Sequence, residues 1–147
     1  MKRIIEYRKL FDVTPDADLN KLKTVYRKLV KEWHPDKFQE GDPLKAQAES
    51  KSKVIIDAYQ FLVSINPETH AQNKEEYVLT TSTSGIDDFS YKGVTLKITF
   101  QNGSTYEYFN VQKGTYQKLV NSPTQARFAR RHILNSHLYR NVSKATL

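Results

Sequence analysis

The chain has 147 residues, of which 38% are hydrophobic and 27% charged. This globular composition suits one domain of average size or two small ones. The sequence contains no cysteine, which excludes disulfides, thiolate zinc sites, iron–sulfur clusters and cysteine nucleophiles. The net charge is +7, with 10 basic and 5 acidic side chains in residues 71–147 against 13 and 11 in residues 1–70. This excess favours an acidic partner, namely nucleic acid, an anionic membrane surface or an acidic protein face, while solvated lysines on helix faces are the simpler alternative.

The distribution of apolar residues along the chain bears on targeting signals and on domain boundaries. No run of about 18 apolar residues occurs, and charged residues interrupt the N-terminal segment. We therefore expect a cytoplasmic protein with neither a membrane span nor a cleaved signal peptide. Apolar residues recur at helical spacing before residue 66 and alternate after residue 77. This change predicts two domains, 1–65 and 77–147, joined at 66–76 by a polar linker or by a short helix after Pro67.

Three helices are predicted in the first half, at about residues 3–11, 17–33 and 44–64. The second helix follows polar start signals around Asp16 and Asp18, and Pro35 ends it by disfavouring helical geometry at His34. The second and third helices are long, and each has one apolar face. We expect them to pack as an antiparallel hairpin. Lysine and arginine side chains lie mostly off the apolar stripe of the second helix, at Lys21, Lys23, Arg27, Lys28 and Lys31.

The tetrapeptide His34-Pro35-Asp36-Lys37 stands at the end of this basic helix. Pro35 fixes its own φ and restricts His34, which predicts a stiff, exposed turn. The Asp36 carboxylate can accept a bidentate hydrogen bond from a partner arginine, and His34 can donate or accept on either ring nitrogen. A catalytic role is disfavoured because no serine or threonine nucleophile accompanies these residues. An inert loop on a helical hairpin is the remaining alternative.

Residues 4–65 resemble the J-domain of DnaJ-type co-chaperones. The resemblance is carried by the His34-Pro35-Asp36 triplet after a basic amphipathic helix, and by the sequence AYQFL at 58–62 in the third helix. It implies that the triplet, Lys37 and the basic helix bind the ATPase domain and linker of a DnaK-type heat-shock chaperone and favour its hydrolysis-competent state. The J-domain itself would carry out no reaction. Ser52 stands where the family commonly has an apolar aromatic residue, which predicts a thinner core at that end.

The second half is predicted to be α+β. Strands are expected around Tyr77–Thr81, Asp87–Lys92, Val94–Phe100 and Tyr106–Phe109, with a hairpin turn at Asn102-Gly103. Two helices follow, one at 114–121 capped by Thr115 and one from Gln125 to about Leu138. With the helical first half, the fold class is α+β: a helical hairpin domain followed by a small antiparallel β-meander with two helices.

Residues 79–142 resemble the KTSC domain, a short module found after some lysyl-tRNA synthetases and alone in small bacterial proteins. The resemblance is carried by Tyr106-Glu107-Tyr108, by the preceding strand Val94–Phe100 with its Asn102-Gly103 turn, and by the terminal helix ending in His137-Leu138-Tyr139. It implies a binding module for which RNA has been suggested as the ligand.

The environment of Tyr106 and Tyr108 depends on the hairpin register. A two-residue loop pairs Tyr106 with Thr99 and exposes both tyrosines as a stacking surface for bases. A three-residue loop that pairs Gln101 with Thr105 buries both. We favour the buried arrangement, because cross-strand pairs of aromatic and apolar side chains are stabilising.

Basic residues in the second half are candidates for contact with phosphates in either register. They are Lys97, Lys113, Lys118, Arg127, Arg130, Arg131 and Arg140. A solvated helix face is the alternative interpretation. The histidines lack metal-ligand spacing, and we expect neither a metal nor another cofactor.

The sequence therefore predicts a co-chaperone that is not an enzyme. Its N-terminal domain would stimulate a DnaK-type ATPase, and its C-terminal domain would select the location or the client, which the sequence does not identify. RNA or ribosome targeting predicts salt-sensitive binding. The alternative is an RNA-binding or protein-binding adaptor in which the helical hairpin is only structural; protein binding predicts weak salt dependence and an apolar surface patch.

Overall fold

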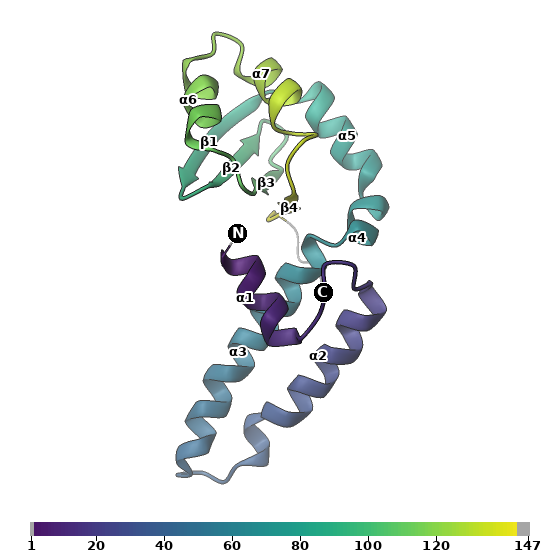
Figure 1. The fold of residues 1–147 in the computed structure, drawn as a ribbon, viewed down its shortest axis with the longest axis vertical. Coiled ribbons are helices and arrows are strands. Elements are labelled where there is room, and N and C mark those ends of the chain that lie inside the picture. The colour runs from purple at the N-terminus through teal and green to yellow at the C-terminus, as the bar shows by residue number, and fades with distance from the viewer. Residues whose placement is uncertain (1, 144–147) are drawn as a thin grey trace. The chain divides into compact units, whose positions relative to one another are not determined.

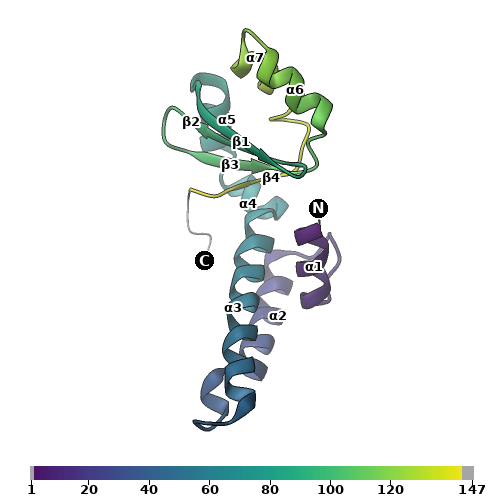
Figure 2. The same cartoon turned by 90° about the vertical axis from the view of Figure 1, so that its left-hand side faces the viewer.

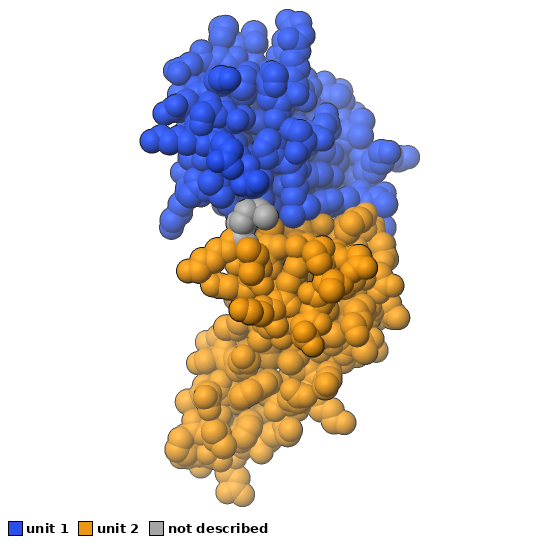
Figure 3. All heavy atoms as spheres, in the orientation of Figure 1, with its two compact units in different colours: residues 1, 69–145 blue, residues 2–68, 146–147 orange. Residues whose placement is uncertain are grey.

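The computed structural model describes residues 2–143. The chain divides into two compact units, and the division falls between Glu68 and Thr69 (Figure 3). In chain order, the first unit comprises residues 2–68 (orange in Figure 3) and is helical. The second unit begins at Thr69 (blue in Figure 3) and combines a sheet with helices, which confirms the α+β class. No helix within residues 2–143 is long and apolar enough to cross a membrane.

The first unit contains helices α1 (Lys2–Phe11), α2 (Leu19–Trp33) and α3 (Pro43–Ser64), with one 3-10 turn, η1 (Pro35–Lys37), between α2 and α3. Helix α2 begins where the Asp18 carboxylate accepts a hydrogen bond of 2.7 Å from the backbone N–H of Lys21. Asp42 caps α3 in the same way at the N–H of Leu44, at 2.9 Å. Such caps satisfy amide groups that a helix start leaves without partners.

Helices α2 and α3 lie side by side and antiparallel, as Figure 1 shows. Their interface is apolar and aromatic: Leu22, Ile55, Ala58 and Leu62 are buried. The ring of Tyr59 stacks on Tyr26 with centroids 4.1 Å apart. The burial of these apolar side chains stabilises the hairpin of α2 and α3, because apolar burial is the dominant favourable term in folding.

The second unit is built on a four-stranded antiparallel sheet in the order β1-β2-β3-β4. The strands are β1 (Ile86–Lys92), β2 (Thr95–Phe100), β3 (Thr105–Tyr108) and β4 (Tyr139–Asn141). Helices α6 (Lys113–Asn121) and α7 (Gln125–His132) lie on one face of the sheet (Figure 2). The core of this unit combines side chains of β2 and β3 with Tyr77, Leu119, Ala129, Ile133 and Leu134.

The structure corrects the predicted strand at residues 77–81. This segment lies in helix α5 (Lys74–Thr83), which follows the short helix α4 (Pro67–Gln72). Tyr77, Thr80 and Thr81 are buried, at the spacing of one helical face. The predicted linker at 66–76 therefore contains α4 and the start of α5.

Two further boundaries differ from the sequence prediction. The helix expected at Gln125 to Leu138 ends at His132, and the segment His137-Leu138-Tyr139 leads into strand β4. Helix α6 begins at Lys113 after Gln112, so Thr115 lies inside the helix and is not its cap. The expectation that this module ends in a helix is wrong, because the last segment completes the edge of the sheet beside β3.

The hairpin between β2 and β3 has a three-residue loop, Gln101–Gly103, closed by a hydrogen bond of 2.8 Å from Phe100 N–H to the Ser104 carbonyl. Gly103 has φ +90°, a conformation that glycine adopts at little cost. Tyr106 pairs with Ile98 and Tyr108 with Leu96. The favoured burial of both tyrosines is confirmed, but neither cross-strand pairing considered from the sequence is the observed one.

Candidate functional site

The segment His34–Lys37 forms the turn that follows α2. His34 is extended, with φ −63° and ψ 126°, and it ends the helix one residue before Pro35. The turn is closed by hydrogen bonds from Lys37 N–H to the His34 carbonyl at 3.0 Å and from Phe38 N–H to the Pro35 carbonyl at 3.1 Å. A proline-led 3-10 turn with two such bonds is a stiff presentation of its side chains.

The side chains of His34 and Asp36 are both accessible in this turn. His34 Nδ1 accepts a hydrogen bond of 3.2 Å from the backbone N–H of Asp36. In the neutral imidazole the proton therefore resides on Nε2. The Asp36 carboxylate lies 3.6 Å from Nδ1, and its side chain is 87% exposed. The turn thus presents an N–H donor and a carboxylate acceptor next to each other.

Helix α3 holds the end of α2 that carries this turn. The Ser52 hydroxyl donates a hydrogen bond of 2.8 Å to the carbonyl oxygen of Trp33, the last residue of α2. The Lys51 ammonium lies 5.6 Å from the centroid of the Trp33 ring. Ser52 therefore satisfies a backbone carbonyl that has no hydrogen-bond partner within helix α2. The sequence indicated only that Ser52 replaces a common aromatic residue, and it did not indicate this hydrogen bond.

The cations of α2 occupy its outer side. Each of the following residues is exposed and forms no ion pair with any residue among 2–143: Lys21, Lys23, Arg27, Lys28 and Lys31. Successive positions turn by about 100° in a helix, so these five positions cover one continuous half of α2. Lys37 adds a further exposed cation beside Asp36. The result is a positive helix face that leads to the His34–Asp36 turn.

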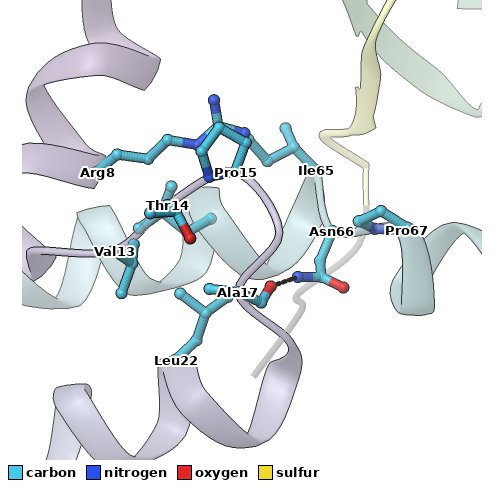
Figure 4. Close-up of a pocket in the computed structure, with 10 residues that line it drawn as sticks. Arg8, Val13, Thr14, Pro15, Ala17, Leu22, Ile65, Asn66 and Pro67 are labelled. Atoms are coloured by element: carbon cyan, nitrogen blue, oxygen red, sulfur yellow. Dashed lines mark hydrogen bonds between the residues drawn. The ribbon is translucent and has the colours of Figure 1, made fainter.

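A small cavity lies at the opposite end of α2, lined by residues that include Arg8, Pro15 and Leu22 (Figure 4). Its volume is about 20 Å³, enough for about one water molecule. The Asn66 side chain reaches across to donate a hydrogen bond of 2.9 Å to the Ala17 carbonyl. The cavity lies between the end of α3 and the loop before α2, and it is too small for an organic ligand.

In the second unit, Tyr106 and Tyr108 are 3% and 0% exposed. Tyr77 Oη donates a hydrogen bond of 2.6 Å to the Leu134 carbonyl. Because Tyr77 has a single hydroxyl proton, the 2.9 Å contact between Tyr77 Oη and Tyr108 Oη has Tyr108 as its donor. Burial raises the pKa of Tyr108, and donation to Tyr77 raises it further. The three tyrosines are therefore part of the core, and Tyr106 and Tyr108 offer no stacking surface for bases.

The predicted phosphate-contacting cations do not form one surface. Arg140 forms an ion pair of 2.9 Å with Glu107 across β3 and β4, and both side chains are largely buried. Lys97 lies between Ser90 and Glu107 in the sheet, on the face opposite to the buried side chains of Leu96 and Ile98. The other five belong to the helices: Lys113 and Lys118 to α6, and Arg127, Arg130 and Arg131 to α7.

Comparison with known proteins identifies both units. Residues 6–73 match the DnaJ domain, and residues 82–139 match the KTSC domain. A match to the DnaJ domain is thus followed by a match to the KTSC domain, which confirms the two resemblances predicted from the sequence.

Individual relatives resemble only part of the chain. A curved DNA-binding protein of Pseudomonas syringae pv. tomato is 43% identical over 70 residues, which are 48% of this chain and 20% of that protein. The chaperone protein DnaJ of Thermotoga petrophila is 39% identical over 57 residues, 39% of this chain and 15% of the relative. The human DnaJ homolog subfamily B member 3 is 37% identical over 59 residues, 40% of this chain and 39% of the relative. The chain therefore spans well under half the length of these relatives.

Proposed function

We propose that this protein is a J-domain co-chaperone that docks on a DnaK-type chaperone in the cytoplasm and stimulates its ATPase. The observation that carries the proposal is the stiff turn His34–Asp36, presented at the end of a positive helix face. The DnaJ domain match and the chaperones among the relatives support it.

Docking is expected in two stages. The cations of α2 attract an acidic surface of the partner over a distance, which raises the association rate and makes it sensitive to salt. The turn then makes the close contacts: the Asp36 carboxylate accepts hydrogen bonds from a partner arginine, and His34 Nε2 donates one. Such contacts can shift the partner only if they are stronger in its hydrolysis-competent state.

In this proposal the protein is not an enzyme. ATP hydrolysis takes place in the partner, and the turn of the J-domain changes the population of partner states. The alternative, in which the hairpin is only structural, leaves the exposure of His34 and Asp36 without a role. In either case the second unit would select the RNA, ribosome or protein on which the complex acts.

RNA binding is the second candidate function, and we propose it for the KTSC unit. The observation that favours it is charge: residues 108–147 contain no aspartate or glutamate but contain Lys113, Lys118, Arg127, Arg130, Arg131, Arg140 and Lys144. Arg140 is paired with Glu107, but the remaining cations of this segment have no acidic residue near them in sequence, and such a run attracts a polyanion. A protein ligand would instead bind an exposed apolar patch. The exposed apolar residues Val78 and Leu79 lie on α5, whereas Val120 lies on α6.

The test of the J-domain proposal is the ATPase rate of a DnaK-type chaperone with and without this protein. His34→Gln removes the imidazole and is expected to abolish stimulation while Trp33 fluorescence shows an unchanged fold. Lys53→Gln, at an exposed position of α3, is the control and should stimulate as the parent does. Full stimulation by the His34 variant would contradict the proposal.

A further inference from the structure

The outer face of α7 forms a shallow basic hollow. It is lined by Ser122, Thr124, Arg127, Phe128, Arg131 and His132, and its volume is about 240 Å³. The positions in α7 are separated by three and four residues and so share one face of the helix. The opposite face is buried at Ala129, which packs in the core under the helix. The hollow is therefore fixed by the packing of α7 on the sheet.

The two arginines at this face have no electrostatic compensation. Arg127 and Arg131 are one helical turn apart and exposed, and neither forms an ion pair with any residue that the structure describes. Like charges at this spacing repel and lower the stability of a helix. Since no carboxylate occurs after Glu107 in the sequence, the arrangement favours an anion supplied from outside the chain.

The polar groups around the arginines are hydrogen-bond donors. Ser122 Oγ accepts a bond of 3.2 Å from Thr124 N–H, so its own proton remains available to donate. The Thr124 side chain does not cap α7, although it precedes the first residue of the helix. Guanidinium groups and hydroxyls together match the oxygens of a phosphate, which only accept hydrogen bonds.

An aromatic pair completes the hollow. The rings of Phe128 and His132 are in contact, with centroids 4.6 Å apart and planes inclined by 42°. Phe128 is only partly buried against the core, which leaves part of its ring at the surface. Aromatic rings beside phosphate-binding cations are the combination that single-stranded nucleic acids bind, because every base has a face that can stack.

The size of the hollow bears on the kind of ligand. Pockets that enclose a free small molecule are about 300–1,000 Å³ and deep, whereas this one is smaller and lies open along a helix. It can hold one phosphate with its base against the rings while the rest of a chain continues outside. A polymer suits this shape better than a free nucleotide.

We propose that this face of α7 binds one nucleotide of single-stranded RNA, with its phosphate on Arg127 and Arg131 and its base on Phe128 and His132. The inference rests on the RNA candidate function of the KTSC unit. It assigns that function to α7 and not to the central tyrosines, to Lys97 on the sheet or to Arg140.

The experiment measures fluorescence anisotropy of a labelled 12-nucleotide oligouridine with the full chain over a KCl series. The test variant is Arg127→Ala/Arg131→Ala, and the control is Lys74→Ala/Lys92→Ala, which removes the same charge from exposed positions elsewhere in the unit. Because the two arginines share one phosphate in this proposal, their loss should reduce the slope of log K against log[salt] by about 0.7, the value for one phosphate on a single strand. We expect an affinity loss of about tenfold or more for the test variant, and a much smaller one for the control.

The outcomes separate the two proposals. No binding of oligouridine by the parent chain at low salt would overturn RNA binding altogether. Binding by the parent, with equal losses in the test and control variants, would overturn the α7 site and leave the RNA function in place. Inorganic polyphosphate that competes as well as RNA of equal charge would overturn the role of the aromatic pair, whereas weaker competition supports it. Near-UV circular dichroism of each variant confirms that the tyrosine core is intact.

Discussion

Replacement of Tyr77 by phenylalanine tests the core of the second unit most sharply. The hydroxyl of Tyr77 donates to the Leu134 carbonyl and accepts from Tyr108, at 2.6 and 2.9 Å. Its removal leaves one buried acceptor and one buried donor without this partner, and each such group costs about 1–3 kcal/mol. Allowing for some relaxation, we expect Tyr77→Phe to lower the free energy of unfolding by about 2–4 kcal/mol.

Tyr106→Phe is the matched control. It removes the same atom from a neighbouring buried ring whose hydroxyl forms no hydrogen bond with any residue among 2–143. We expect a change below about 0.5 kcal/mol, the usual size for a substitution that removes no specific interaction. Urea unfolding followed by near-UV circular dichroism at the tyrosine band measures both variants. Equal stabilities for the two variants would refute the hydrogen-bond network as described.

Two other predictions concern capping and pH. Asp18→Ala removes the N-cap of α2 and should cost the first unit about 1 kcal/mol by Trp33 fluorescence in urea; a shift below about 0.3 kcal/mol would contradict the cap. Burial raises the pKa of Tyr106 to about 12, so above pH 10 the unfolded chain loses this proton first. The contribution of this group to stability is therefore fully present below about pH 10, and about 2 kcal/mol of it is lost by pH 12. Urea midpoints measured from pH 9 to 11 should fall in the parent and fall less in Tyr106→Phe, and equal falls would contradict this assignment.

The J-domain could be predicted from sequence because its signals are local. The apolar stripe, the polar residues before α2 and the effect of Pro35 on His34 each act within one or two turns of helix. The stiff turn His34–Asp36 follows from these signals alone. The bond from Ser52 to the Trp33 carbonyl could not be predicted in this way, because it joins residues 19 positions apart in sequence.

Helix α5 shows why local signals fail in the second unit. Its β-branched threonines and alternating apolar residues favour a strand. In the structure the hydroxyls of Thr81 and Thr83 donate to the carbonyls of Tyr77 and Leu79, four residues earlier. These bonds satisfy the side chains within a helix. The contacts of Tyr77 with Leu134 and Tyr108 add tertiary stabilisation that outweighs propensity.

The register of the β2–β3 hairpin could not be predicted from the sequence, for a related reason. Asn102-Gly103 is compatible with two-residue and three-residue loops, and the sequence does not choose between them. In the structure Asn102 Nδ2 donates to Thr80 Oγ1 at 2.9 Å, a contact with α5. A helix that was expected to be a strand thus helps to fix the turn, so the two errors are connected.

The central claim is that the turn after α2 acts on a DnaK-type partner through its carboxylate. Single-turnover ATP hydrolysis by that partner, measured with the parent, Asp36→Asn and Asp57→Asn, tests it directly. Asp57 is an exposed carboxylate on α3 and serves as the control. A lost charge-assisted hydrogen bond costs about 1.5–3 kcal/mol, so Asp36→Asn should lower the stimulation about tenfold or more. The Asp57 variant should stimulate as the parent does, and equal stimulation by all three proteins would contradict the account.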